Sequence, residues 1–139
     1  MAKLSDVVAA INEMNAAYPR PGMGPLELSE AFNVRTEFAS SYPGAANAGV
    51  YVFLSADDVV LYVGKASVGL GARLGAHFRY SDSDRNAGYA TDPEFRNAGI
   101  AVIRTIRVDP GHEFEAGAIE SFLIGRLQPP LNKQGTAGK

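Results

Sequence analysis

Two short apolar runs, both rich in β-branched and aromatic residues, stand on either side of a polar turn in the middle of the sequence. The first run begins with Gly49-Val50-Tyr51, the second ends with Tyr62-Val63-Gly64, and Ser55-Ala56-Asp57-Asp58 separates them. Such runs are typical of β-strands, and a short polar segment between them suits an antiparallel reversal. The sequence therefore predicts a β-hairpin, and with it an antiparallel sheet.

A helix is predicted directly after the hairpin. Leu70, Leu74 and Phe78 recur there with helical spacing and would form one apolar face. Arg73 and His77 are four residues apart, so the same helix would bring both side chains together on a neighbouring face. A guanidinium and an imidazole are thus expected side by side on this helix.

Hydrophobic periodicity predicts the other elements. An amphipathic helix should start near Ser5 and end before Pro19, and residues 28–39 form a weaker helical stretch. A third strand is expected over residues 100–108, and a further helix from about Glu113 to Leu127, where two prolines stop it. The apolar face of the first helix would consist of Leu4, Val7, Val8, Ile11 and Met14.

These elements together predict a small α/β (α+β) fold, with a mainly antiparallel three-stranded sheet flanked by helices. Residues 1–48 would form a helical N-terminal extension, residues 49–132 the central domain, and residues 133–139 a flexible tail. A chain of 139 residues with 46% apolar composition suits one such domain. Two interpretations of the extension stay open, a helical cover over one face of the sheet or an arm for dimerisation or substrate selection.

Five short motifs occur in an order that core packing does not require. They are Gly49-Val50-Tyr51, Leu61-Tyr62-Val63-Gly64-Lys65, Arg73, Glu120, and Pro129-Pro130-Leu131-Asn132. In their order and spacing the chain resembles the GIY-YIG nuclease superfamily, with valine in place of isoleucine in both naming tripeptides. The histidine four residues after the arginine, His77, is similar to that of the restriction-enzyme branch. The resemblance covers residues 49–132.

The resemblance implies a metal-dependent endonuclease that hydrolyses phosphodiester bonds of DNA. The catalytic residues that it implies are Tyr51, Tyr62, Arg73, His77, Glu120 and Asn132. Glu120 would be the metal ligand, and a lone carboxylate suits one Mg²⁺ or Mn²⁺ ion that takes its other ligands from water and the substrate phosphate. Arg73 would bind the scissile phosphate through both prongs of its guanidinium.

The identity of the general base stays open. Tyr51 is the implied base, although a phenol has a reference pKa of about 10. His77 would help by accepting the phenolic proton or by orienting the hydroxyl. Tyr62 would position a phosphate oxygen or a water. Asn132 would tie the C-terminal segment to the surroundings of the catalytic tyrosine.

The candidate substrate-binding residues are Lys65, Arg79, Arg85 and Arg96. Lys65 could contact a phosphate or simply be exposed. The arginines lie in or beside residues 80–99, a polar stretch that also contains Tyr80, Tyr89 and Phe95. Such a mixture could hold phosphates and stack on bases, and the alternative is a solvated, mobile loop.

Composition limits the remaining possibilities. A net charge of −2 is low for a DNA-binding protein, but residues 62–107 hold seven basic and four acidic side chains, so a local basic face with weak non-specific affinity is expected. The chain has no cysteine, which excludes disulfides and a thiolate zinc site. It has neither a signal-peptide pattern nor an apolar run of about 18 residues, so we expect a cytoplasmic protein without a membrane partner.

A second function class stays open beside the enzyme. The chain could be a non-catalytic nucleic-acid-binding or interaction module that keeps the fold without turnover. The presence of every expected catalytic residue favours the enzyme. The expected partner is DNA, whether duplex, branched or single-stranded, and residues 1–48 could form a homodimer.

Overall fold

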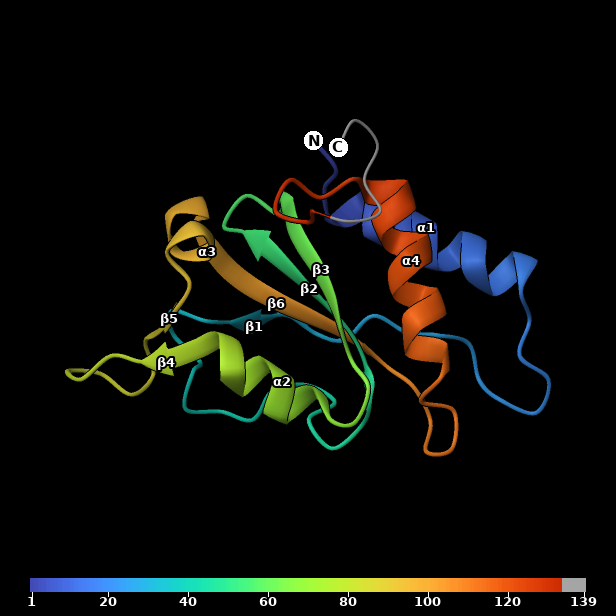
Figure 1. Cartoon of the computed structure of the whole chain (residues 1–139), viewed down its shortest axis with the longest axis horizontal. Helices are drawn as coiled ribbons and strands as arrows, with labels where there is room; N and C mark the ends of the chain where they lie inside the picture. Colours follow the sequence, from blue (N-terminus) through green and yellow to red (C-terminus); the bar gives the residue numbers. More distant parts are fainter. Residues whose placement is uncertain (134–139) are drawn as a thin grey trace.

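The predicted hairpin is present in the computed structural model, which describes residues 1–133. Its strands are β2 (Gly49–Ser55) and β3 (Val60–Ala66), and β6 (Ile100–Arg107) pairs with the other side of β2. A short strand, β1 (Phe32–Asn33), pairs with β6. The main sheet therefore has the order β1-β6-β2-β3, is antiparallel throughout, and ends in β3 at one edge (Figure 1).

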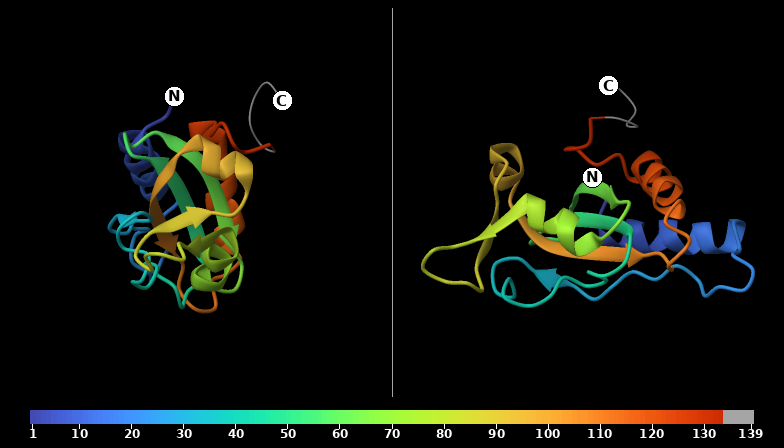
Figure 2. Two further views of the ribbon diagram at one scale, coloured as in Figure 1. Left: turned by 90° about the vertical axis from the view of Figure 1, so that its left-hand side faces the viewer. Right: turned by 60° about the horizontal axis from the view of Figure 1, so that its bottom comes forward.

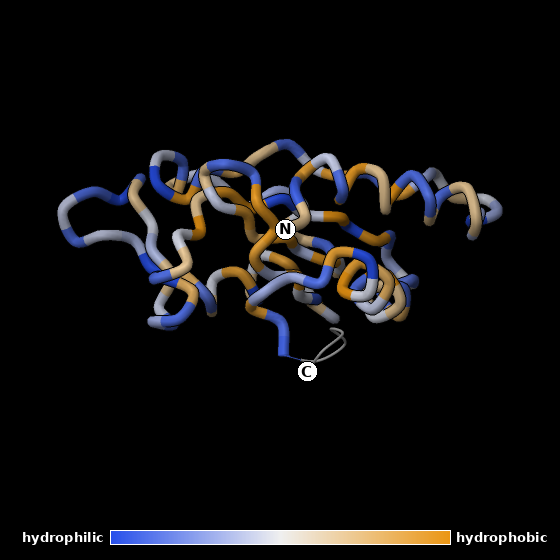
Figure 3. Tube along the Cα trace, turned by 90° about the horizontal axis from the view of Figure 1, so that it is seen from above, coloured by the Kyte–Doolittle hydropathy of each residue, from blue (hydrophilic) through white to orange (hydrophobic). Residues whose placement is uncertain are grey.

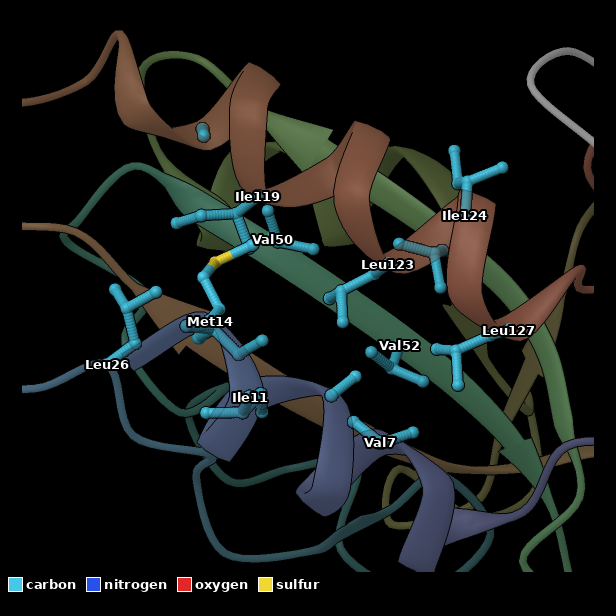
Figure 4. Close-up of a cluster of buried hydrophobic side chains, with 14 of the residues drawn as sticks. Val7, Ile11, Met14, Leu26, Val50, Val52, Ile119, Leu123, Ile124 and Leu127 are labelled. Atoms are coloured by element: carbon cyan, nitrogen blue, oxygen red, sulfur yellow. The ribbon is translucent and has the colours of Figure 1, made fainter. Parts of the chain in front are cut away.

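Helices α1 (Leu4–Ala17) and α4 (Glu115–Leu127) cover one face of this sheet. Figure 4 shows their apolar side chains against Val50 and Val52 of β2. The helical residues in this cluster include Val7, Ile11, Met14, Ile119, Leu123 and Leu127. Because alternate residues of a strand point to opposite faces, Tyr51 and Phe53 face the other side of the sheet.

Helix α2 (Leu70–His77), which the helical spacing predicted, lies on that other side, and Phe78, expected on its apolar face, lies just beyond its end in extended conformation. Leu70 and Leu74 are fully buried in the same cluster as Tyr51 and Phe53 of β2. Helix α2, which carries Arg73 and His77, therefore packs against the buried Tyr51. The order of strand, turn, strand and helix thus places the polar residues of α2 beside β2.

Residues 80–99 are not the single structureless connection that the sequence indicated, because half of them lie in strands or a helix, and their role in holding phosphates stays a prediction. The chain continues from α2 into β4 (Phe78–Tyr80), which pairs with β5 (Gly88–Ala90), and α3 (Pro93–Ala98) follows. Asp92 caps α3 by accepting a hydrogen bond from the Glu94 backbone N–H at 2.8 Å. The β4–β5 hairpin extends from one end of the molecule (Figure 2), and its loop is hydrophilic (Figure 3).

The predicted helix over residues 28–39 was also wrong. Phe32 and Asn33 are extended and pair with Ile103 and Val102 of β6, so the sheet has four strands where three were expected. The Phe32 ring is buried and lies 5.0 Å from the ring of Tyr42, measured between centroids. Pairing with a distant strand therefore overrides the weak local helical pattern.

Helix α1 confirms the predicted N-terminal helix with two differences. It begins at Leu4, where the Lys3 backbone N–H donates to the Asp6 carboxylate at 2.8 Å, so Ser5 is not the cap. Val8 is 43% exposed and does not belong to the buried face. That face is buried against the sheet. A homodimer through residues 1–48 stays a prediction, and it would have to form through other residues of this segment.

The remaining predicted elements agree with the structure to within two residues. The third strand is β6, and the last helix begins at Glu115, which leaves Phe114 outside it and 76% exposed. Apart from Lys133, the tail predicted for residues 133–139 lies outside the described residues. Among residues 1–133, none of the helices has the length and apolar character of a membrane-spanning segment.

Candidate active site

The hydroxyl of Tyr51 is the meeting point of two side chains from α2. It lies 2.9 Å from Nε2 of His77, and Nε of Arg73 donates a hydrogen bond to it at 3.4 Å. Arginine can only donate, so the Tyr51 oxygen accepts from Arg73 and its own proton is free for the histidine. The spacing of four residues on α2 and the central position of Tyr51 in β2 produce this arrangement.

Gly64 makes room for the Tyr51 ring. The two residues are directly opposite each other in the β2–β3 pair. A Cβ added at Gly64 would lie 2.6 Å from Cε2 of Tyr51 and closer still to Cζ and the hydroxyl oxygen, a separation that real side chains do not show. Residue 64 is therefore a glycine because the ring of Tyr51 lies over it.

The protonation states of the contacting pair are set mainly by burial. Burial raises the pKa of Tyr51 to about 12, although the hydrogen bond from Arg73 opposes this shift. Burial and the nearby positive charge of Arg73 both lower the pKa of His77, so its imidazole is neutral at pH 7. In the tautomer that carries its proton on Nδ1, neutral His77 accepts the Tyr51 proton at Nε2.

Glu120 approaches the same place from the opposite face of the sheet. It lies in the middle of α4, and its carboxylate meets the edge strand β3 where Tyr62 and Lys65 are located. Partial burial raises the pKa of Glu120, while attraction to Lys65 and Arg73 works against this rise. The carboxylate is therefore partly desolvated and has cations nearby, but no direct ion pair of Glu120 was found among the described residues.

A groove of about 550 Å³ connects these residues. Its polar lining consists of Tyr51, Tyr62, Lys65, Ser67, Arg73 and Glu120. Burial also raises the pKa of Tyr62, so this phenol stays neutral at physiological pH. The groove thus presents two cationic side chains, two neutral phenols and one carboxylate, a set that can bind an anion and a divalent cation together.

Asn132 holds the C-terminal segment against β3, as the sequence analysis expected. Its side-chain oxygen accepts from the Val63 backbone N–H and its side-chain nitrogen donates to the Val63 carbonyl, both at 2.9 Å. Only 6% of Asn132 is exposed. These two hydrogen bonds pair the N–H and the carbonyl of Val63 at the outer edge of β3, next to Tyr62. Asn132 therefore supports the strand beside the groove but does not itself line the groove.

The three predicted substrate-binding arginines do not line the groove, whereas Lys65 does. Arg79 donates to the carbonyls of Gly75 and Phe78, at the end of α2, at 3.0 Å. The guanidinium carbon of Arg85 lies 4.6 Å from the ring centre of Tyr80, and that of Arg96 lies 5.2 Å from the ring centre of Tyr89. These arginines belong to the β4–β5 hairpin and α3, next to the site.

Phe95 has a role that sequence reasoning missed. The sequence analysis grouped it with aromatic residues that could stack on bases, but it is only 8% exposed. Its ring centroid lies 4.9 Å from that of Tyr62 and 5.7 Å from that of His77, with which it is stacked. Phe95 therefore fixes the orientation of two site residues. The sequence did contain one signal, since Asp92-Pro93 is typical of a helix start and would have placed Phe95 in the first turn of a helix.

The donor set decides which metal the site could hold. Within the described part of the chain, no three histidine, aspartate or glutamate side chains gather at one point. Glu120 is the carboxylate of the groove, so a soft or tetrahedral metal would lack ligands there. Mg²⁺ or Mn²⁺ fits, because such an ion retains waters and accepts phosphate oxygens as ligands.

Comparisons of the chain with models of known protein families, with curated proteins and with solved structures found no match.

Proposed function

We propose that this protein is a metal-dependent endonuclease that hydrolyses phosphodiester bonds of DNA through a GIY-YIG site. The observation that carries the proposal is the contact of the buried Tyr51 hydroxyl with both His77 and Arg73, in a groove that also contains Glu120. Core packing alone requires none of these polar contacts. Phosphodiester hydrolysis requires a proton acceptor, a cation at the phosphoryl oxygens and a metal ligand in one place.

Tyr51 and His77 supply the proton acceptor. A tyrosine whose pKa is about 12 is not ionised at pH 7, so it does not act as a free phenolate. Its hydroxyl instead passes its proton to the neutral Nε2 of His77, 2.9 Å away, while its oxygen takes a proton from the attacking water. His77 is thus the final proton acceptor, and Tyr51 connects it to the substrate.

Arg73 and Lys65 supply positive charge for the phosphate. Arg73 is exposed on α2 and uses one nitrogen for Tyr51, so the other guanidinium nitrogens remain available for phosphate oxygens. This contact strengthens as negative charge accumulates on the phosphate during the reaction. Tyr62, a neutral phenol at the rim, can donate a hydrogen bond to a phosphate oxygen or a water.

Glu120 would hold one Mg²⁺ or Mn²⁺ ion in this proposal. When bound, the ion stabilises negative charge on the phosphate and the departing oxygen. Partial burial prepares the carboxylate for a cation, because its raised pKa reflects a charge that lacks full solvation. A cation beside it would remove that cost.

A comparison of two glutamate variants tests the proposal. Wild type, Glu120→Ala and Glu113→Ala would be incubated with supercoiled, linear and single-stranded DNA in Mg²⁺, Mn²⁺ or chelator. Glu113 is exposed and precedes α4, outside the groove, so its variant is the matched control. We expect metal-dependent cleavage by wild type and Glu113→Ala, and none by Glu120→Ala. Equal cleavage by all three proteins would exclude Glu120 as the metal ligand.

The alternative of a non-catalytic module makes a different prediction for the same samples. Binding of DNA without cleavage, under every metal condition, would favour the module over the enzyme. Binding would be followed by fluorescence anisotropy of labelled DNA in chelator. A protein that neither cleaves nor binds DNA would contradict both functions.

A further inference from the structure

A second cavity of about 540 Å³ adjoins the groove. Tyr62 and Glu120 line both cavities and form their common boundary. From this boundary the groove extends toward α2, whereas the second cavity extends toward α3 and the C-terminal segment. The other residues that line the second cavity are Glu94, Phe95, Ser121, Ile124, Leu131, Asn132 and Lys133. Its size is within the range of small-molecule sites.

The two cavities differ in charge. The groove has Arg73 and Lys65 opposite one carboxylate. The second cavity has two carboxylates, Glu94 and Glu120, and one cation, Lys133, which is already paired with Glu94 at 3.2 Å. A phosphate is therefore favoured in the groove and repelled in the second cavity.

The walls of the second cavity suit a flat, neutral ligand with hydrogen-bond donors. Phe95, Ile124 and Leu131 contribute apolar surface, and the half-buried ring of Tyr62 contributes an aromatic face. The carboxylate of Glu94 and the hydroxyl of Ser121 accept hydrogen bonds. The Glu94–Lys133 pair is more than half exposed, so a ligand can displace it at little cost.

We propose that this cavity binds the nucleobase next to the scissile phosphate, unstacked from its neighbours. The inference rests on the proposed function, because the boundary at Tyr62 and Glu120 is where the phosphate would be cut. A nucleotide chain that crosses this boundary places its phosphate in the groove and the adjoining base in the second cavity. Bases with an exocyclic amino group, which donate hydrogen bonds, suit the carboxylate of Glu94 better than thymine does.

The proposal defines a substrate preference. A base enters the cavity only when it is unpaired, or after the enzyme extrudes it from a duplex. Unpaired nucleotides in single strands, bulges or junctions therefore make better substrates than continuous duplex DNA. The net charge of −2 agrees with this preference, because a protein without a net positive charge gains little from duplex phosphates alone.

Abasic substitution tests the cavity directly. A single-stranded oligonucleotide with one mapped cleavage site would be prepared as a series, each member lacking the base at one position around that site. We expect one neighbouring position at which loss of the base slows cleavage by wild type about 10-fold, the effect of one stacked base. Uniform cleavage of the whole series would overturn the proposal.

Two variants separate a base pocket from a general effect on catalysis. Ser121→Phe places a large ring at an exposed lining position of α4, and Ser5→Phe makes the same change on the exposed side of α1. We expect Ser121→Phe to cleave intact DNA about 10-fold more slowly than wild type does. DNA that lacks the base at the sensitive position should be cleaved equally fast by Ser121→Phe and by wild type. Ser5→Phe should match wild type on both. A Ser121→Phe variant that slows both substrates equally would contradict the pocket.

A binding measurement keeps this test independent of the proposed function. In chelator, wild type would be titrated with single strands that carry cytosine, thymine or no base at each position, and fluorescence anisotropy would report affinity. We expect a position where cytosine binds several-fold more tightly than thymine, and where Glu94→Ala removes the difference. If wild type cleaves nothing but shows this preference, the endonuclease proposal fails and the pocket stands. Equal affinities at every position would remove the pocket, whether or not the protein cleaves DNA.

Discussion

Replacing Gly64 with alanine would test the packing that holds the candidate active site. The added Cβ would lie 2.6 Å from Cε2 of Tyr51 and closer still to Cζ and the hydroxyl oxygen, whereas ordinary contact begins at 3.4 Å, so the ring must move by at least about 0.8 Å. Overpacking of a well-packed core costs about 1–3 kcal/mol. The displaced hydroxyl would also lose its 2.9 Å contact with His77, and a misplacement of about 1 Å costs about 100-fold in rate.

The measurements are denaturant unfolding and single-turnover DNA cleavage, with Gly125→Ala as the matched control. Gly125 lies in α4, and a Cβ there would meet nothing within 4 Å. Alanine at that helical position should therefore stabilise the protein by about 0.5–1 kcal/mol and leave cleavage unchanged. In a double variant, Tyr51→Ala should relieve most of the stability cost of Gly64→Ala. Additive costs, or a Gly64→Ala variant as stable as wild type, would refute the reasoning.

Three further predictions concern protons and buried polar groups. His77→Ala should reduce the cleavage rate about 100-fold. In wild type the rate should rise with pH as His77 loses its proton, with a midpoint below its ordinary 6.5, and a pH–rate profile that keeps this limb in His77→Ala would contradict the role. Asn132→Ala leaves the buried N–H and carbonyl of Val63 without partners, which should cost about 2–4 kcal/mol in denaturant unfolding; a loss below about 1 kcal/mol would refute this. Glu120→Gln should raise the melting temperature at pH 7, because a raised pKa means that ionised Glu120 opposes folding, most fully above that pKa. The gain should disappear in acid, where the carboxyl of wild type is protonated, and an equal gain at all pH values would show another cause.

The parts of the fold that local patterns predicted are those that depend on local contacts. The β2–β3 hairpin and helices α1, α2 and α4 each carry their own periodicity, and each is present in the structure. Strand β1 could not be predicted in this way. Its two residues are extended because they pair with β6, about 70 positions away in the sequence, and no local pattern records that pairing.

The same distinction applies to the site. Spacing alone indicated that Arg73 and His77 lie side by side on α2, whereas their contact with Tyr51 was expected only from the resemblance to the GIY-YIG superfamily. The second cavity could not be predicted, because it forms where α3, α4 and the segment at residues 131–133 come together. Likewise, the sequence did not reveal that Phe95 is buried against His77 and Tyr62, since this depends on where α3 folds back.

Single-turnover cleavage of end-labelled DNA by wild type and Arg73→Ala tests the central claim most directly. Arg73 is exposed and contributes no apolar packing to the core, so its variant should fold normally, which circular dichroism would check. The account predicts Mg²⁺-dependent cleavage by wild type, no cleavage in chelator, and a rate at least about 100-fold lower for Arg73→Ala. Cleavage at equal rates by folded wild type and Arg73→Ala, or no cleavage of any DNA by wild type with metal present, would contradict it.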